Sequence, residues 1–267
     1  MTAPHGKHVW SQHWADPRKI FDGLTDDYDQ FRPHYSEGAL QALASYTGNA
    51  RYVLDLGSGT GILTRALRRQ FPDAVIVGGE PGSDMLRTAA DTTPAELDLS
   101  WFASHAESLP VADGSLDLIT VGQAAHWFDR SAFYDECARV LRPDGALAVL
   151  YNNRIMDRPV ALALEGALKR LAPGYHRGYR DFDCEGELQR HAAARNVRQL
   201  VDVWTWRRTV DDFIGYVRST SHFKVAVRER SESEVMAHLK DALHPQASDD
   251  GVLHVDYQSV VTMARFG

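Results

Sequence analysis

The chain has 267 residues, and its 44% of hydrophobic and 24% of charged residues exclude a disordered, collagen-like or coiled-coil chain. Its formal net charge of −7 argues against a protein that binds nucleic acid over its whole surface, because such proteins are normally basic. Two cysteines are too few for a disulfide framework, and neither a signal peptide nor an apolar run of about 18 residues is present, so we expect reduced thiols in a soluble, cytoplasmic protein with no membrane partner.

The first 50 residues predict an N-terminal helical arm or lid. His5, His8 and His13 lie in the first 19 residues, but no second ligand cluster accompanies them, and we predict no metal site. Apolar residues at three- and four-residue steps then predict two helical stretches between residues 16 and 46, which Pro33 separates.

Residues 51–151 predict the core of the fold, in which strands alternate with helices. Short apolar runs predict strands at residues 52–56, 74–79, 99–103, 116–121 and 146–151. Helical patterns lie between them at residues 62–71, 83–90 and 131–141. This alternation is typical of an α/β protein with a doubly wound, mostly parallel sheet covered on both faces.

After residue 151 the alternation stops. Helices are predicted at residues 152–195, 210–224 and 231–242, and strands at residues 197–208 and 252–264. We therefore expect a helical cap over residues 152–245 that contains one core strand, and a last core strand within residues 246–267. No linker suggests a second independent domain.

The most informative segment is the turn DLGSGTG at residues 55–61, which joins the first predicted strand to a helix. Its three glycines permit a sharp turn and the close approach of a ligand, and the helix start offers N–H groups to an anion. The spacing differs from the GxGxxG dinucleotide fingerprint, and no GK[ST] of a phosphate loop follows. A tight turn without a ligand remains the alternative.

Polar residues also follow the other predicted strands. Glu80 ends the second strand, where a carboxylate can accept hydrogen bonds from two ribose hydroxyls. Residues 104–110 form a polar loop after the third strand, and residues 123–128 follow the fourth. Because the carboxyl ends of parallel strands meet at one edge of a sheet, we expect a nucleotide site there. The alternatives are that Glu80 is an exposed acid and that Asp55 only caps the turn.

In order, DLGSGTG, Glu80, the AESLP loop, LDLITVGQAAHWF and VLRPDGALAVL resemble the class I S-adenosylmethionine-dependent methyltransferases over roughly residues 28–151. The HWF after the fourth strand and YxxFRPxY at residues 28–35 are similar to the trans-aconitate methyltransferase-like branch. The resemblance implies a Rossmann-like sheet of seven strands, S-adenosyl-L-methionine as cofactor and S-adenosyl-L-homocysteine as product.

The resemblance also implies roles for cofactor-binding residues. Glu80 would hold the ribose hydroxyls, Gln123 would lie under the methionine moiety, and Arg32 would close over the methionine carboxylate, although Arg32 pairing with a surface carboxylate remains an alternative. The full implied set is Tyr28, Arg32, Asp55, Gly57, Ser58, Gly59, Gly61, Glu80, Pro81, Met85, Ala106, Glu107 and Gln123.

Methyl transfer from a sulfonium needs placement and exclusion of water rather than covalent help. We predict a small-molecule acceptor with a carboxylate, hydroxyl or activated carbon, and His126 as the candidate general base because it follows a strand end. His126 orienting Trp127 is the alternative. The residues expected to line the substrate pocket are Trp127, Phe128, Asn152, Tyr216, Ser219 and His222. The many aromatic residues of the cap predict a partly apolar or planar substrate, or else form the core of the cap.

Two other functions stay open. A protein of the same fold can use the cofactor without methyl transfer, for a rearrangement or a cyclisation. An NAD-dependent oxidoreductase is the other, and the glycine spacing argues against it. We expect no nucleic-acid partner, because the charge is acidic and no Asn/Asp-Pro-Pro-Tyr/Phe motif follows the fourth strand. The oligomeric state is left open.

Overall fold

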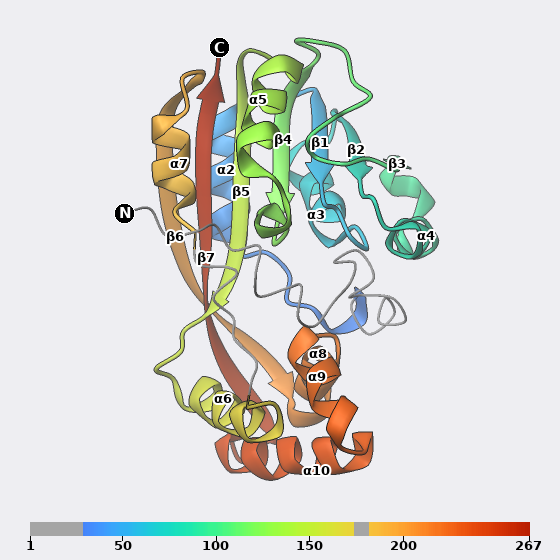
Figure 1. The fold of residues 1–267 in the computed structure, drawn as a ribbon, viewed down its shortest axis with the longest axis vertical. Helices are drawn as coiled ribbons and strands as arrows, with labels where there is room; N and C mark the ends of the chain where they lie inside the picture. The colour runs from blue at the N-terminus through green and yellow to red at the C-terminus, as the bar shows by residue number, and fades with distance from the viewer. Residues whose placement is uncertain (1–28, 174–181) are drawn as a thin grey trace.

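Figure 1 shows the computed structural model of the chain, which describes residues 29–173 and 182–267. A seven-stranded sheet with the strand order β3-β2-β1-β4-β5-β7-β6 fills the upper part, and a cluster of helices lies at the lower end. This confirms the predicted α/β class with a mostly parallel, Rossmann-like sheet.

Five strands run parallel in the order that the alternating pattern predicts. They are β1 (Tyr52–Leu56), β2 (Val75–Gly79), β3 (Leu99–Phe102), β4 (Leu116–Gly122) and β5 (Leu141–Arg154). The prediction for β5 was too short at both ends. Residues 142–145, expected to end a helix and turn, belong to the strand, with Asp144 at a positive φ of 68° and a register shift on β4 between Leu116 and Leu118.

Helices cover both faces of the sheet, as parallel strands require. On one face lie α2 (Glu37–Thr47) and α3 (Ile62–Gln70), and on the other lie α5 (Arg130–Val140) and α7 (Cys184–Arg190). The remaining short elements of the sheet half are α4 (Ser83–Thr92), which lies beside β3, and the 3-10 turns η2 (Ala95–Leu97) and η3 (Ala125–Trp127).

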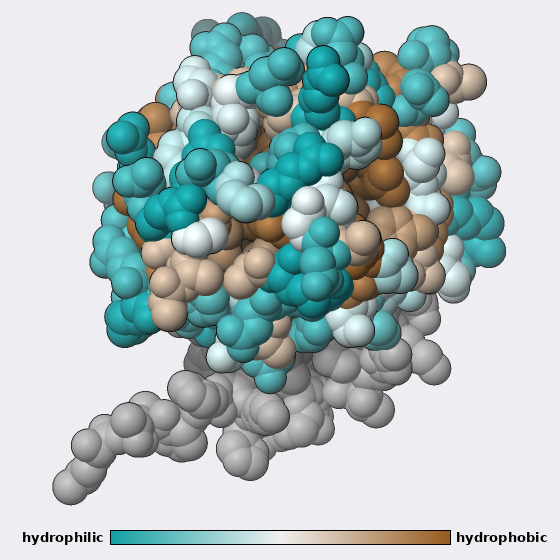
Figure 2. Space-filling view, turned by 90° about the horizontal axis from the view of Figure 1, so that it is seen from above, coloured by the Kyte–Doolittle hydropathy of each residue, from teal (hydrophilic) through white to brown (hydrophobic). Residues whose placement is uncertain are grey.

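Two long strands connect the sheet to the helical cluster. Strand β7 (Val252–Phe266) runs antiparallel to both β5 and β6 (Ala194–Thr209), and both long strands continue past the sheet toward the lower end in Figure 1. Because β7 runs upward in this view, the parallel strands run downward and their carboxyl ends face the helical cluster. The opposite end, seen from above in Figure 2, is covered mainly by hydrophilic residues.

The helical cluster, which we call the cap, has a hydrophobic core of its own. It consists of α6 (Pro159–Leu171), α8 (Val210–Arg218), α9 (Ser221–Glu229), α10 (Glu232–Leu243) and the 3-10 turn η5 (His244–Gln246). The prediction of one helix over residues 210–224 was wrong. Helix α8 ends at its C-cap residue Ser219. Thr220 is the N-cap of α9, and its side chain accepts a hydrogen bond from the Phe223 N–H.

The predicted helix within residues 16–28, and with it Tyr28, lies outside the described residues. Among the helices of residues 29–173 and 182–267, none combines the length and apolar character needed to cross a membrane.

Candidate functional site

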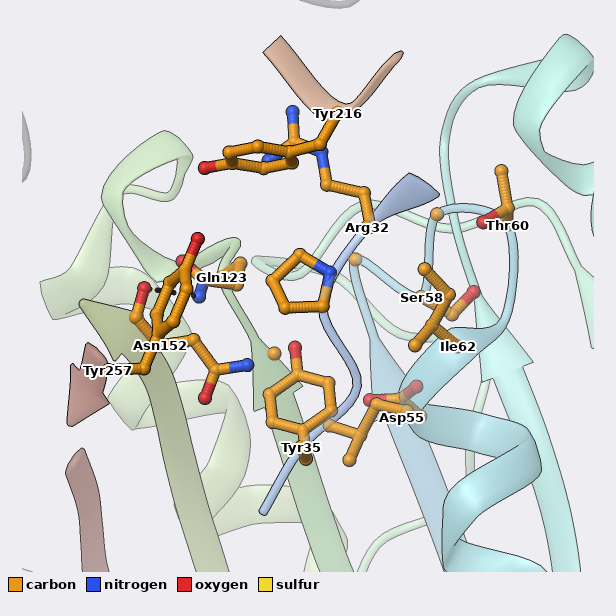
Figure 3. Close-up of a pocket in the computed structure, with 15 residues that line it drawn as sticks. Arg32, Tyr35, Asp55, Ser58, Thr60, Ile62, Gln123, Asn152, Tyr216 and Tyr257 are labelled. Atoms are coloured by element: carbon orange, nitrogen blue, oxygen red, sulfur yellow. Dashed lines mark hydrogen bonds between the residues drawn. The ribbon is translucent and has the colours of Figure 1, made fainter. Parts of the chain in front are cut away.

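A pocket lies between the carboxyl edge of the sheet and the cap (Figure 3), and it holds about 600 Å³ of space, part of it open to solvent. The Gly-rich turn forms one wall, the ends of β4, β5 and β7 form another, and α8 with residues 32–35 closes a third. The lining residues are Arg32, Pro33, Tyr35, Asp55, Gly57, Ser58, Gly59, Thr60, Ile62, Leu63, Gly122, Gln123, Asn152, Tyr216 and Tyr257.

The three glycines of the turn all have positive φ, but their surroundings differ. A Cβ at Gly57 would lie 2.5 Å from the Cβ of Ala124, and one at Gly61 would lie 2.4 Å from the Trp101 ring. Packing within the chain therefore accounts for these two. At Gly59 a Cβ would meet no atom within 4 Å, so this glycine faces open space in the pocket wall.

Besides the Tyr257 hydroxyl on β7, three polar atoms in the pocket wall are buried without a hydrogen-bond partner among the described residues. They are Ser58 Oγ, Thr60 Oγ1 and Gln123 Oε1. Leaving such a group unpaired costs about 1–3 kcal/mol, so native proteins seldom do so without a reason. Two hydroxyls that donate or accept and one amide oxygen that accepts fit a ligand with hydroxyl, amino and carboxylate groups.

Asp55 is fully buried at the end of β1. Its Oδ2 accepts from the Thr64 hydroxyl of α3 at 2.6 Å, and its Oδ1 accepts from the Thr120 hydroxyl of β4 at 2.9 Å. Burial, with a smaller contribution from the charge of Glu80, raises the pKa of Asp55 to about 7. Asp55 thus ties β1 to its neighbours as well as lining the pocket.

Glu80 follows β2 and is fixed against the Gly-rich turn. Its Oε2 accepts from the Gly59 N–H at 3.2 Å and its Oε1 accepts from the Gly82 N–H at 2.9 Å. Burial raises the pKa of this carboxyl group. Each oxygen keeps a further lone pair, so the fixed carboxylate can accept from two ligand hydroxyls beside Gly59.

Gln123 has a φ of 60°, which is uncommon for a residue other than glycine. Its Nε2 donates to the Asn152 carbonyl at 3.1 Å, which orients Oε1 as the unpaired acceptor. The Asn152 amide is fixed in turn, since it donates to the His34 carbonyl and accepts from Ser259 at 2.6 Å. Asn152 therefore positions Gln123 in addition to lining the pocket.

Arg32 links the N-terminal segment to the cap. Its Nε donates to Ser219 Oγ at 3.0 Å and its Nη2 donates to the Ser219 carbonyl at 2.8 Å. The guanidinium lies 5.4 Å from the centre of the Tyr216 ring, and both side chains border the pocket in Figure 3. Ser219 is fully buried, so it acts on the pocket through Arg32.

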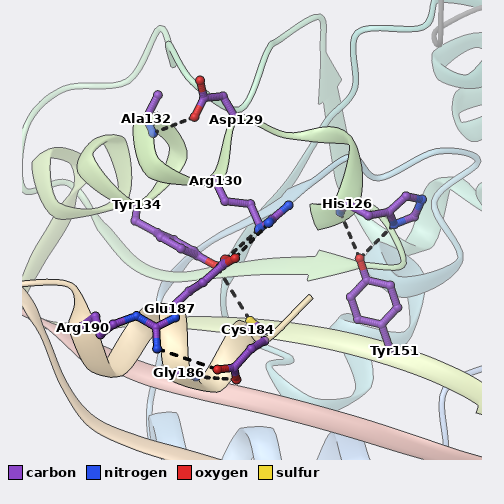
Figure 4. Close-up of polar contacts among 11 residues, drawn as sticks. His126, Asp129, Arg130, Ala132, Tyr134, Tyr151, Cys184, Gly186, Glu187 and Arg190 are labelled. Atoms are coloured by element: carbon purple, nitrogen blue, oxygen red, sulfur yellow. Dashed lines mark hydrogen bonds and ion pairs between the residues drawn. The ribbon is translucent and has the colours of Figure 1, made fainter. Parts of the chain in front are cut away.

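Several predicted residues do not line this pocket. His126 lies in η3, where its N–H and Nδ1 both contact the Tyr151 hydroxyl, at 3.1 and 2.9 Å (Figure 4). Glu107 accepts from the Asp129 N–H at 2.8 Å, at the start of α5. The others outside the lining are Gly61, Glu80, Pro81, Met85, Ala106, Trp127, Phe128, Ser219 and His222, of which Glu80 and Ser219 contact the lining residues Gly59 and Arg32. Their predicted roles remain predictions.

The contacts around α5 in Figure 4 are of a different kind. Arg130 donates to both oxygens of Glu187, at 2.7 and 2.9 Å, and the Tyr134 hydroxyl donates to the same carboxylate at 3.1 Å. These contacts join α5 to α7, and both oxygens of Glu187 already accept hydrogen bonds within the chain. We therefore assign these residues to the packing of the two helices.

Sequence reasoning did not identify three polar lining residues. Tyr35 lies in the YxxFRPxY segment and Thr60 between two glycines, so both had a local signal. Tyr257 lies in β7, about 200 residues after the Gly-rich turn, and only the antiparallel pairing of β7 with β5 brings it to the site.

Residues 54–149 match the family model described as a methyltransferase domain. The chain is 40% identical over 135 residues to an uncharacterized methyltransferase of Mycobacterium tuberculosis, covering 50% of this chain and 52% of that protein. It is 38% identical over 106 residues to the malonyl-[acyl-carrier protein] O-methyltransferase of Hahella chejuensis, covering 39% of this chain and 37% of that protein. The chain spans about half the length of the curated relatives it matches first.

The solved structure of a candidate type II methyltransferase from Anaeromyxobacter dehalogenans is similar in fold, with a TM-score of 0.67 at 21% identity over 88% of this chain and 98% of that one. The matched segment contains the Gly-rich turn, Glu80 and Gln123. Residues 54–149 therefore form a methyltransferase domain.

Proposed function

We propose that this chain binds S-adenosylmethionine in the pocket of Figure 3 and transfers its methyl group to a small acceptor molecule held under the cap. The observation that carries the proposal is the set of buried, unpaired atoms Ser58 Oγ, Thr60 Oγ1 and Gln123 Oε1 in the pocket wall. The family supplies the cofactor class, and these atoms are of the kind that a ligand with hydroxyl, amino and carboxylate groups would satisfy.

When bound, the cofactor supplies a methyl group that is already activated by its sulfonium. The chain then has to hold and orient its ligands and keep water out. In our proposal Glu80 accepts from ribose hydroxyls beside Gly59, and Arg32, fixed by Ser219, faces the methionine carboxylate. The Tyr216 ring covers the pocket from the cap side.

The pocket lining favours an acceptor that is ionised before it binds. Asp55 is the one carboxyl group among the described lining residues, and both of its oxygens already accept from threonine hydroxyls. Burial keeps the pKa of Tyr257 well above its usual value, which makes this phenol a poor base. A carboxylate acceptor needs no base, and the O-methyltransferase named for Hahella chejuensis is in keeping with an oxygen acceptor.

A matched pair of threonines tests the proposal. Thr60→Val removes a buried hydroxyl that has no partner, so we expect unchanged or slightly higher stability of the free protein. We expect it to weaken S-adenosylmethionine binding by about three- to tenfold, because one ligand hydrogen bond is worth about 0.5–1.5 kcal/mol. Calorimetric titration and thermal unfolding measure the two effects.

Thr64→Val is the control, since the Thr64 hydroxyl donates to Asp55 and is equally buried. It should lower stability, because it removes one of the hydroxyl donors to a buried carboxyl group. Loss of stability in Thr60→Val with unchanged affinity would contradict the assignment of the pocket.

Production of S-adenosylhomocysteine separates methyl transfer from the alternatives. We expect it to rise when small carboxylic acids are added, and to rise less with phenols, which are not ionised at neutral pH. Tight cofactor binding with no turnover on any nucleophile would favour a protein of the same fold that catalyses a rearrangement. Binding of NADH in place of S-adenosylmethionine would favour an oxidoreductase.

A further inference from the structure

Strand β6 forms the outer edge of the sheet, beyond β7 (Figure 1). It is 16 residues long, and on its outer side no other strand pairs with it among the described residues. Its middle carries three exposed apolar side chains, Leu200 at 37%, Val201 at 51% and Val203 at 63%. A long exposed edge of this kind is a template for pairing with another strand.

Two charged side chains lie on either side of Leu200 along the strand. Arg198 and Asp202 lie four residues apart, too far along an extended strand to reach each other, since each residue advances by about 3.3 Å. Neither side chain makes a hydrogen bond or an ion pair within residues 29–173 and 182–267. Both lie on the α2 face, because Leu200 between them pairs with Val261 in the core under α2.

We propose that β6 pairs antiparallel with β6 of a second copy of this chain, with the two Leu200 residues opposite each other on the two-fold axis. In this register Arg198 of each copy lies directly opposite Asp202 of the other, which gives two ion pairs on one face. On the other face Val201 of each copy is diagonal to Val201 of the other. Opposite charges and apolar pairs at facing positions both stabilise antiparallel strands.

The structure limits the length of this pairing. The β6–β7 register shifts between Arg195 and Arg198, and Asn196 has a positive φ of 52°. Such a bulge bends the strand and ends regular pairing. The new ladder therefore covers residues 198–202, and the Leu200-centred register is the one that places Arg198 opposite Asp202. An isologous contact of this kind closes a dimer and leaves the outer β3 edges unchanged.

Charge reversal tests both the dimer and its register. We expect sedimentation velocity of the full chain to show a dimer. Arg198→Asp should place Asp opposite Asp twice and weaken the dimer at least about tenfold, and Asp202→Arg should do the same with Arg opposite Arg. The double variant Arg198→Asp/Asp202→Arg restores both ion pairs and should restore the dimer.

Arg69→Asp is the matched control, because Arg69 is exposed on α3 and away from β6. It makes the same change of charge and should leave the dimer intact. As a second measurement on the wild type, amide hydrogen exchange of residues 199–203 should slow as protein concentration rises.

A monomeric wild type at every concentration would overturn the proposal, as would a dimer that none of the β6 variants affects. A double variant that stays monomeric would overturn the Leu200-centred register.

Discussion

The cap differs from one face of the sheet in the side chains of its core. The core under α2 and α3 has Phe71 as its one buried aromatic residue, whereas the core under α5 and α7 on the other face contains Phe133, Tyr134 and Phe266. The core of the cap instead contains the cluster Trp206, Phe213, Tyr216 and Tyr257, with ring centres 5.5 to 6.2 Å apart. Only Tyr216 and Tyr257 of these four also line the pocket. The aromatic residues of the cap therefore serve mainly to pack its own core, and only some of them also contact the pocket.

The largest effect we expect comes from breaking the aromatic core of the cap. Phe213→Ala removes a fully buried ring and should lower the free energy of unfolding by about 3–5 kcal/mol. Chemical denaturation measures it. Leu162→Ala on α6 is the control, since Leu162 is 59% exposed and its loss should change stability by less than about 0.5 kcal/mol. Equal effects of the two changes would refute a separate packed core in the cap.

On the sheet side, the buried carboxyl group of Asp55 should make stability depend on pH. Its pKa of about 7 lies above the unfolded value of 3.8, so the folded state binds more protons between these values. Folding stability should therefore fall as pH rises from about 4 to about 7, by up to about 4 kcal/mol. The difference in unfolding free energy between wild type and Asp55→Asn isolates this contribution. A difference that stays constant over that range would show that Asp55 titrates normally.

A smaller effect is expected at the ligand-binding wall. Glu80→Ala removes an acceptor for two hydroxyls and should weaken S-adenosylmethionine binding by about 1.5–3 kcal/mol. Titration calorimetry measures the change, and Glu96→Ala, an exposed acid in η2, is the control. Unchanged affinity in Glu80→Ala would remove Glu80 from the cofactor site.

The smallest effect should come from His126. The sequence predicts a base whose loss lowers turnover more than cofactor affinity, but the residue contacts Tyr151 and lies outside the pocket lining. From this geometry we expect His126→Ala to lower turnover by less than about tenfold, whereas loss of a general base typically costs about 10²–10⁴-fold. A loss in that larger range, with cofactor affinity unchanged, would restore His126 as the base.

The part of the fold that sequence could predict is the part with local signals. The Gly-rich turn and Glu80 each follow a buried strand, so their position at the sheet edge follows from the alternation of strands and helices. Tyr257 and Ser219 reach the site only through pairing of distant strands and a contact with Arg32, 187 residues away in sequence from Ser219.

The break between α8 and α9 was missed for a related reason. Residues 210–224 keep a helical apolar pattern on both sides of Ser219, and only hydrogen bonds of Ser219 and Thr220 to the preceding turn end the first helix. The spacing of apolar residues does not predict such hydrogen bonds, because serine and threonine also occur within helices.

The most direct test of the account is calorimetric titration of the full chain with S-adenosylmethionine, S-adenosylhomocysteine and NADH in parallel. We predict micromolar binding of the two sulfur nucleotides and no binding of NADH, with Thr60→Val weakening both without loss of stability. Binding of NADH alone would contradict the assignment of the Gly-rich turn, and with it the proposed methyl transfer.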